Sequence, residues 1–234
     1  MKTEQLQIGN IPAMLWGKST GKLYLYIHGQ GGNKEDAELL ANLICELGWQ
    51  VLSIDLPGHG SRKDEIDSFT PWHVVPELHS VMNFAKARAD YISLFANSIG
   101  AWFSMLAFRN EEISECMFVS PVLDMENLIL KFMAWANVSP EQLQKERVIT
   151  TTFGQTLTWE YWSYVLANPI NEWNVPTKIL YGGKDNLVDR NVIENFSRKF
   201  DCSLTVIDNA EHWFHTEEQL AALTQWITKN VGEE

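Results

Sequence analysis

Short apolar runs alternate with amphipathic stretches along most of this chain. The runs at 23–27, 50–54, 91–97, 115–119, 178–181 and 203–207 are continuous, as expected for strands that are covered on both faces. Stretches with helical periodicity follow most of them, at 34–47, 71–89, 101–108, 191–200 and from 216 onward. This alternation predicts a mostly parallel, doubly wound α/β sheet with helices on both faces.

Local signals sharpen several of these boundaries. Two short strands at 6–8 and 13–16, joined by a turn at 9–12, predict an edge hairpin, and Gly48 is the expected stop of the first helix. Pro76 either kinks the helix at 71–89 or marks its first turn. Thr216 is a plausible cap for the last helix. We expect that helix to turn the following residues inward: Leu220, Leu223, Trp226 and Ile227.

Residues 122–173 break the alternation of strands and helices. The segment is rich in aromatic and aliphatic side chains, and we expect a mainly helical cap inserted over the strand ends of one domain spanning 1–234. Aromatic side chains at helical spacing usually pack against other helices. A cap that packs on the sheet can also line an apolar substrate pocket, for which the candidates are Phe132, Trp135, Trp159 and Trp162.

Composition narrows the class of protein. A chain of 234 residues with 45% hydrophobic residues is globular and long enough for one substantial core. The net charge of −12, without any Lys/Arg cluster, argues against nucleic-acid binding. No apolar run is long enough to span a bilayer, and the N-terminus lacks the apolar stretch of a secretory signal. The scattered Cys45, Cys116 and Cys202 predict reduced thiols in a cytoplasmic protein and show no metal-binding spacing.

The segment from Tyr91 to Gly100 carries the strongest chemical signal. It predicts a buried strand, then Ser98 between small residues, then a helix, which is the order that a nucleophile elbow requires. The residues two before and two after the serine must be small, and here they are Ala96 and Gly100. The alternative is an ordinary serine cap at a helix start.

The rest of the chain supplies partners for a serine nucleophile in the order Ser, Asp, His. His212, in the loop after the last strand, is the predicted base, and His215 ranks below it because it falls at a helix start. Asp185, in the loop after the penultimate strand, is the predicted acid, with Asp124 as the alternative. The predicted oxyanion donors are the backbone amides of Gln30 and Ile99.

Five motifs in this order resemble the α/β-hydrolase superfamily over nearly the whole chain. They are the segments 28–32 (HGQGG), 55–61 (DLPGHGS), 96–100 (ANSIG), 182–185 (GGKD) and 210–212 (AEH). The chain is most similar to small bacterial esterases, cinnamoyl-esterase-like enzymes, monoglyceride lipases and serine-aminopeptidase-like hydrolases. The resemblance implies the α/β-hydrolase fold and loop-shaping roles for His28 and His59.

The chain departs from the family pattern at three positions. Ala96 replaces the usual first glycine, Asn97 stands where many relatives carry histidine or another residue, and Asp189 stands where proline is common. None of these changes removes a catalytic atom. They leave open which subfamily the chain resembles most, and with it the substrate.

These observations predict a serine hydrolase that cleaves a carboxylic ester of a small to medium apolar acyl or aryl group through an acyl-enzyme. A thioester, an amide or peptide, or a carbon–carbon bond could be cleaved by the same triad. A third hypothesis is a non-catalytic ligand-binding protein on the same fold. Neither a metal nor an organic cofactor is implied, the expected partner is a small ester-type molecule, and the oligomeric state is open.

Overall fold

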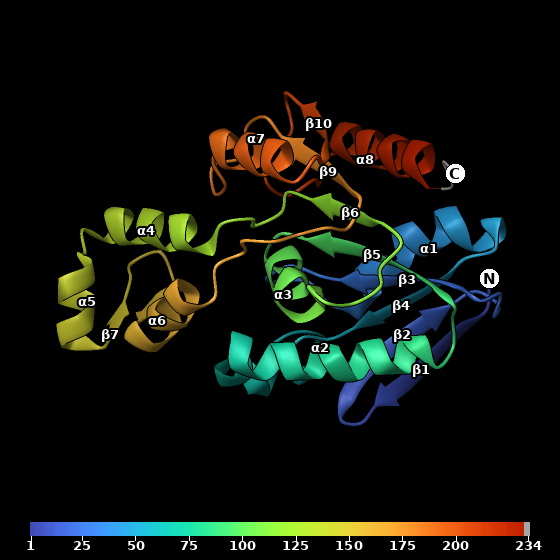
Figure 1. The fold of residues 1–234 in the computed structure, drawn as a ribbon, viewed down its shortest axis with the longest axis horizontal. Coiled ribbons are helices and arrows are strands. Elements are labelled where there is room, and N and C mark those ends of the chain that lie inside the picture. The colour runs from blue at the N-terminus through green and yellow to red at the C-terminus, as the bar shows by residue number, and fades with distance from the viewer. Residues whose placement is uncertain (232–234) are drawn as a thin grey trace.

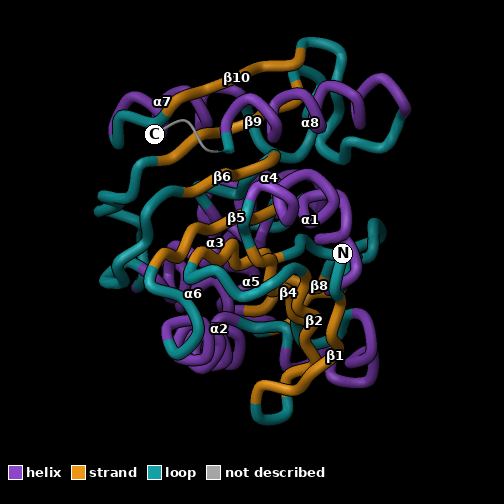
Figure 2. The backbone as a smooth tube through the Cα atoms, turned by 90° about the vertical axis from the view of Figure 1, so that its right-hand side faces the viewer, coloured by secondary structure: helices purple, strands orange, loops and turns teal. Residues whose placement is uncertain are grey.

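An eight-stranded sheet forms the centre of the molecule. The computed structural model describes residues 1–231, and the last three residues of the predicted domain, 232–234, lie outside the described residues. The sheet has the order β1-β2-β4-β3-β5-β6-β9-β10, and Figure 2 shows its twist. Its strands are β1 (Thr3–Ile8), β2 (Ile11–Trp16), β3 (Lys22–Ile27), β4 (Gln50–Ile54), β5 (Tyr91–Asn97), β6 (Cys116–Val119), β9 (Thr177–Gly182) and β10 (Ser203–Ile207).

The sheet is parallel except at one edge. Strands β1 and β2 form the predicted antiparallel hairpin, and β2 also pairs antiparallel with β4. All pairs from β4 to β10 are parallel, so the mostly parallel, doubly wound sheet expected from the sequence is confirmed. Strand β4 lies on one side of β3, and the next strand in the chain, β5, lies on the other side. Such a reversal of strand order opens a crevice at the carboxyl ends of the two adjacent strands, here β3 and β5.

Helices cover both faces of this sheet (Figure 1). The helices outside residues 122–173 are α1 (Glu38–Ile44), α2 (Pro71–Lys86), α3 (Ile99–Phe108), α7 (Arg190–Lys199) and α8 (Glu217–Asn230). The core on one face holds side chains of α2, α3 and α7, and the core on the other holds side chains of α1 and α8. Strand residues alternate between the two: Leu25 and Ile27 belong to the first core, Tyr24 and Tyr26 to the second.

The helix predictions are confirmed with local differences. The stretch 34–47 is three consecutive pieces, the 3-10 turn Lys34–Ala37, α1 and the 3-10 turn Cys45–Leu47, and Gly48 ends it in the left-handed conformation at φ 87°. Helix α2 begins at Pro71 and accommodates Pro76 in its interior. A third 3-10 segment, Gly60–Ser68, precedes α2.

Helix α8 has the predicted cap and only part of the predicted inward face. Thr216 and Gln219 form a capping box at its start. Trp226 and Ile227 are buried, whereas Leu223 is half-buried and Leu220 is 39% exposed. The expectation that all four apolar side chains point into the core was therefore wrong for Leu220, because this part of the helix borders a cavity described below.

The segment between β6 and β9 forms a lobe of its own. It contains α4 (Met125–Ala136), α5 (Pro140–Glu146), α6 (Trp159–Ala167) and a small antiparallel hairpin of β7 (Val148–Thr150) and β8 (Thr156–Thr158). Figure 1 shows the lobe on the side of the sheet where β6 ends. The segment is mainly helical, and the hairpin is an addition that the sequence pattern did not indicate.

Helix α3 starts very close to the end of β3. A Cβ atom on Gly100, in the first turn of α3, would lie 2.5 Å from the carbonyl oxygen of His28 and 2.7 Å from that of Ile27. Both obstacles are backbone atoms, which cannot turn aside as a flexible side chain can. Only glycine therefore allows α3 to begin at this distance from β3.

Replacing Gly100 by alanine should lower the free energy of unfolding by roughly 2 kcal/mol, because the added methyl group overpacks a rigid contact. Urea denaturation followed by circular dichroism measures this loss. The control is Gly154→Ala, in the β7–β8 turn, where φ is +87° and no atom lies within 4 Å of the added Cβ. Its cost should be only the left-handed strain of about 1 kcal/mol, so equal losses in both variants would contradict the contact argument.

Candidate active site

Ser98 occupies a strained turn at the carboxyl end of β5. Its backbone has φ 50° and ψ −123°, which is unfavourable for a residue with a side chain. Three hydrogen bonds hold it there: its amide donates to Val119 (3.0 Å), and its carbonyl accepts from the amides of Ala101 (3.1 Å) and Val122 (3.0 Å). These backbone hydrogen bonds fix the turn at Ser98, and with it the direction in which the side chain leaves the backbone.

The hydroxyl of Ser98 meets the imidazole of His212. The distance from Ser98 Oγ to His212 Nε2 is 2.8 Å, and His212 Nδ1 lies 2.7 Å from Asp185 Oδ2. Because Nδ1 faces a carboxylate, it carries the proton and leaves Nε2 free to accept the serine proton. The three side chains, which come from three different loops, form one continuous hydrogen-bonded chain.

Asp185 is fixed on its other side by the backbone. Its Oδ1 accepts hydrogen bonds from the amides of Leu187 (2.8 Å) and Val188 (3.0 Å). The carbonyl of Val188 in turn accepts from the hydroxyl of Tyr181 (2.8 Å), at the end of β9. The Asp185 side chain is fully buried and that of His212 is 15% exposed. A buried carboxylate with this many donors keeps its orientation and holds that of the imidazole.

Backbone contacts clamp the loops of Asp185 and His212 together. The amide of Lys184 donates to Ala210 (2.8 Å), and that of Gly183 donates to Ile207 (2.9 Å). A Cβ atom on Gly182 would lie 2.4 Å from the carbonyl oxygen of Glu211. Gly182, the last residue of β9, and Gly183 therefore let two loops approach closely enough for their side chains to meet.

The alternative acid and base lie in other surroundings. Asp124 caps α4, where its Oδ1 accepts from the amide of Asn127 (2.9 Å). His215 places Nδ1 2.7 Å from the carbonyl oxygen of Trp213 and stacks on the ring of that residue at 4.8 Å. The structure thus brings His212 and Asp185 to Ser98, and it gives Asp124 and His215 local roles.

The two amides expected to bind an oxyanion flank Ser98. Ile99 is the first residue of α3, so its N–H is one of the groups without an intrahelical partner at a helix start. Gln30 follows Gly29, where a Cβ atom would lie 3.0 Å from Cβ of Ser98. The glycine thus allows this loop to pass directly beside the serine.

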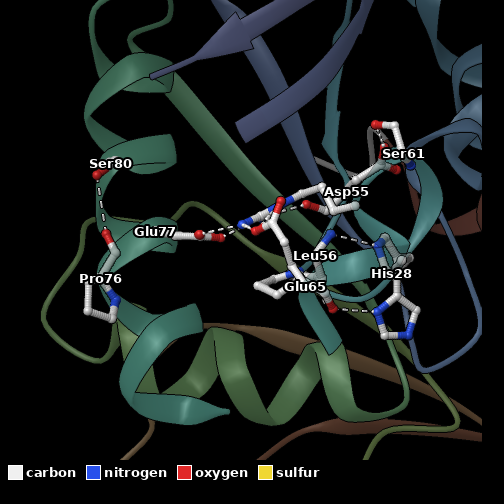
Figure 3. Close-up of polar contacts among 11 residues, drawn as sticks. His28, Asp55, Leu56, Ser61, Glu65, Pro76, Glu77 and Ser80 are labelled. Atoms are coloured by element: carbon white, nitrogen blue, oxygen red, sulfur yellow. Dashed lines mark hydrogen bonds and ion pairs between the residues drawn. The ribbon is translucent and has the colours of Figure 1, made fainter. Parts of the chain in front are cut away.

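A buried network fixes the loop that carries Gln30 (Figure 3). His28 Nε2 accepts from the amide of Leu56 (3.0 Å), and Nδ1 donates to the carbonyl of Gly29 (2.7 Å). Asp55, also buried, accepts from the Lys34 amide and ammonium, both at 2.8 Å. These bonds tie the loop after β3 to the loop after β4, in agreement with the loop-shaping role that the family resemblance implies for His28.

The same network continues away from the serine. Arg62 donates to Glu77 (2.7 Å from both Nη1 and Nη2) and to Glu65 (2.6 Å from Nη2), and its Nη1 reaches the carbonyl of Asp55 (3.2 Å). His59 donates to the carbonyl of Pro57 (2.8 Å). Glu77 on α2 and Glu65 in the 3-10 segment thus support the turn at 55–62 through Arg62, and this turn supports the loop of Gln30.

A cavity of about 590 Å³ opens beside Ser98 and His212. Its walls come from the loop after β3, from the sheet and from α1 and α8. The lining residues are Tyr26, Gly29, Gln30, Gly31, Gly32, Asp36, Leu39, Leu40, Phe95, Asn97, Ser98, Val119, Ser120, His212, Trp213, Phe214, Leu220, Leu223 and Ile227. This size is ordinary for a site that binds a small molecule.

The four aromatic residues expected to line a pocket do not line this cavity. Phe132 and Trp135 pack on each other and on Phe153 in the lobe, with ring centroids 5.6–5.8 Å apart. Trp162 is buried, and the guanidinium carbon of Arg147 lies 5.9 Å from the ring of Trp159. The lining residues on α1 and α8 were not predicted from the sequence as part of a pocket. The available signal was Trp213, a large aromatic residue next to the predicted base, which is 74% exposed.

The chain belongs to the alpha/beta hydrolase family, whose family model matches residues 24–225. Esterase Rv0045c of Mycobacterium tuberculosis is 32% identical over 92 residues, which are 39% of this chain and 30% of that protein. The match therefore spans less than a third of the relative's length.

Solved structures share the fold over the whole length of the chain. Est1E of Butyrivibrio proteoclasticus with bound ferulic acid aligns over 97% of this chain and 96% of its own, with a TM-score of 0.78 and 19% identity. Mouse alpha/beta hydrolase domain-containing protein 10 aligns over 98% of both chains, with a TM-score of 0.78 and 14% identity. A monoacylglycerol lipase of Paleococcus ferrophilus aligns over 94% of this chain and 99% of its own, with a TM-score of 0.68 and 16% identity.

Two kinds of feature are absent from the part of the chain that the structure describes. Within residues 1–231, no helix has the length and apolar character needed to cross a bilayer. The same residues contain no cluster of three or more His, Cys, Asp or Glu side chains with the arrangement of a metal site.

The burial of His28 should make stability depend on pH. Burial lowers the pKa of His28 from its ordinary 6.5 to about 4. Between about pH 6.5 and pH 4 the unfolded chain therefore binds a proton at this histidine and the folded protein does not. The free energy of unfolding falls as the pH drops through this range. The loss attributable to His28 is about 3 kcal/mol over this window.

Urea denaturation at pH 7, 5.5 and 4 gives the free energy of unfolding of the wild type and of His28→Gln. The loss due to His28 is the amount by which the wild-type value falls more than that of the variant between pH 7 and pH 4. The variant should be less stable at pH 7 but lose less stability on acidification. His73→Gln, at an exposed position in the first turn of α2, is the control and should follow the wild type. Parallel curves for the wild type and His28→Gln would contradict the assignment.

Proposed function

We propose that this protein is a serine hydrolase that cleaves carboxylic esters through an acyl-enzyme. The observation that carries the proposal is the hydrogen-bonded chain from Ser98 Oγ to His212 Nε2 (2.8 Å) and from His212 Nδ1 to Asp185 Oδ2 (2.7 Å). These distances are those of a nucleophile, a base and an orienting acid. Membership of the α/β hydrolase family supports the proposal.

In the proposed mechanism, Ser98 Oγ attacks the ester carbonyl carbon while His212 Nε2 takes its proton. The carbonyl oxygen becomes an oxyanion, which receives hydrogen bonds from the amides of Gln30 and Ile99. His212 then gives the proton to the departing alcohol oxygen, and an ester of Ser98 remains. Water attacks this ester by the same route and releases the acid. Asp185 stays ionised and holds the imidazole, which carries a positive charge between the two proton transfers.

The relatives support an ester as the bond. The matched protein of Mycobacterium tuberculosis is named an esterase, one solved structure has ferulic acid bound to Est1E, and another is a monoacylglycerol lipase. We therefore infer that simple aryl and alkyl esters are turned over, and that hydroxycinnamate esters and monoacylglycerols belong in the substrate panel. Thioesters and amides test whether the same triad accepts a different leaving group.

Labelling with a small fluorophosphonate, located by mass spectrometry, tests the nucleophile. The adduct should form on Ser98 in the wild type and be lost in Ser98→Ala and His212→Ala, because the serine is nucleophilic only when a base removes its proton. His215→Ala is the matched control and should label normally. Absence of labelling in a folded wild-type protein would favour a ligand-binding protein on this fold, and an adduct on another residue would show that the assigned nucleophile is wrong.

Removing the orienting carboxylate should be almost as harmful as removing the nucleophile. We expect kcat on p-nitrophenyl butyrate to fall roughly 10⁴-fold in Asp185→Asn, because the amide favours the wrong tautomer of His212. Asp189→Asn, four residues later in the same loop, should retain kcat within a few-fold. Equal activity of Asp185→Asn and Asp189→Asn would remove Asp185 from the mechanism.

A further inference from the structure

The cavity beside Ser98 extends to one particular side of the sheet. Tyr26 and Phe95 form its sheet wall, and both side chains belong to the core on the α1 and α8 face. Leu40 on α1 and Ile227 on α8 form the opposite walls. The lobe at 125–167 contributes no lining residue. The space next to the nucleophile is therefore bounded by the hydrolase core itself.

The inner wall of this space is mainly apolar. Leucine side chains from two helices line it, and Leu223 and Leu39 are only half-buried although they sit at cavity positions of amphipathic helices. Trp213 stands beside His212 and is 74% exposed. Apolar side chains left partly exposed around a concave site favour an apolar ligand there, because its binding removes their surface from water.

Within the described residues, the cavity wall carries a negative charge and no lysine or arginine to balance it. Among its lining residues within the described chain, Asp36 is the one carboxylate, and neither lysine nor arginine is present. The nearby ammonium of Lys34 is held by Asp55 (2.8 Å) and Glu35 (2.9 Å). A carboxylate on a ligand would therefore enter an apolar space that contains a like charge and offers no cation.

Asp36 is fixed at the cavity wall. Its Oδ2 accepts from the amide of Asn33 (3.1 Å), and a Cβ atom on Gly32 would lie 2.5 Å from that oxygen. Gly32 thus lets the carboxylate lie directly against the loop that carries Gln30. Asp36 is an exposed residue whose pKa is raised by the partial burial of its carboxyl group, and the hydrogen bond from the Asn33 amide partly offsets this rise. The assays are run at pH 8, well above the ordinary pKa of a carboxyl group.

We propose that the apolar substituent of an uncharged ester enters the cavity between α1 and α8, and that Asp36 selects against esters carrying a carboxylate on that substituent. This inference rests on the proposed function of Ser98. It names the substrate class as neutral esters of medium apolar groups. It also places the determinants of specificity on α1, on α8 and in the loop after β3, and not on the aromatic residues of the lobe.

Narrowing the cavity tests the location. Leu223→Trp fills space on α8, at a half-buried position that should tolerate a larger side chain, and Leu220→Trp, at a 39% exposed lining position, is the second variant if the first does not fold. Leu166→Trp, on α6 at a 46% exposed position in the lobe, is the matched control. We measure kcat/KM for p-nitrophenyl acetate against octanoate, and for methyl acetate against octyl acetate.

In the cavity variants, the preference for the long substituent should fall at least about tenfold in one of the two series, because one methylene group in an apolar pocket already changes kcat/KM about tenfold or more. A shift in the p-nitrophenyl series assigns the cavity to the acyl group, and a shift in the acetate series assigns it to the alcohol. The Leu166→Trp control should shift neither ratio. If neither ratio moves in a folded cavity variant, the proposed location is wrong.

Removing the charge tests the role of Asp36. If the acyl group enters, the pair is p-nitrophenyl hexanoate against mono-p-nitrophenyl adipate; if the alcohol enters, it is phenyl acetate against 4-acetoxybenzoate. The wild type should prefer the neutral ester at pH 8, and Asp36→Asn, which keeps an acceptor for the Asn33 amide, should reduce that preference about tenfold. Glu38→Gln, at an exposed acidic position outside the cavity lining, should leave it unchanged. An unchanged preference in Asp36→Asn overturns the selection by charge.

Labelling with diisopropyl fluorophosphate separates the two levels of the argument. Labelling at Ser98 together with substrate preferences that do not change in the Leu223 and Asp36 variants would contradict this inference and leave the proposed function intact. A folded wild-type protein without labelling and without turnover of any ester would lose the proposed function itself.

Discussion

The near-contact of two backbones at the carboxyl edge of β3 and β5 is the constraint on which the site depends. Because Gly100 has no Cβ atom, α3 can start against the carbonyl groups of Ile27 and His28, and a methyl group there would lie 2.5 Å from the nearer oxygen. This position of α3 forces the residue before it into the strained conformation that presents the Ser98 hydroxyl. It also brings the free N–H groups of the helix start to the same place. Packing of a helix on a strand thereby fixes together Ser98, the proposed nucleophile, and the amide of Ile99, the proposed oxyanion donor.

A second close approach fixes Asp185 and His212, the proposed partners of Ser98. The backbone bonds between the loops after β9 and β10 set the distance between Asp185 and His212 before either side chain contributes, and Gly182 removes the Cβ that would separate them. The geometry of the proposed triad therefore depends on three strand ends that are ordered by the parallel sheet. Strands β5, β9 and β10, which precede Ser98, Asp185 and His212, all end at the same edge. At Gly29, Gly100 and Gly182 an added Cβ atom would lie 3.0 Å or less from an atom of a neighbouring segment, so these glycines let the segments at this edge approach each other closely.

The fold and the catalytic candidates could be predicted because they depend on local signals. Continuous apolar strands, helical periodicity and glycines at strand ends are readable from the chain, and they led to Ser98, Asp185 and His212. The cavity could not be predicted in this way. Its walls combine Leu40, Phe95 and Ile227, which are far apart in the chain and have the same apolar character as any core residue. The aromatic residues of the lobe gave a stronger sequence signal, yet Phe132 and Trp135 pack on Phe153, because aromatic side chains at helical spacing mostly serve packing.

Successive side chains of a strand point to opposite faces of the sheet. One strand can therefore support the turn of Ser98 on one face and line the cavity on the other. Leu25 and Ile27 of β3 point into the core under α2 and α3, which must be filled to hold the elbow in its strained conformation. Tyr24 and Tyr26 point to the other face, where the neighbouring helices α1 and α8 leave space near the strand end. Changes in the size of side chains on α1 and α8 can therefore alter the cavity without disturbing the packing beneath Ser98. This separation lets the hydrolase core vary the group that it accepts while the geometry of the three catalytic candidates stays constant.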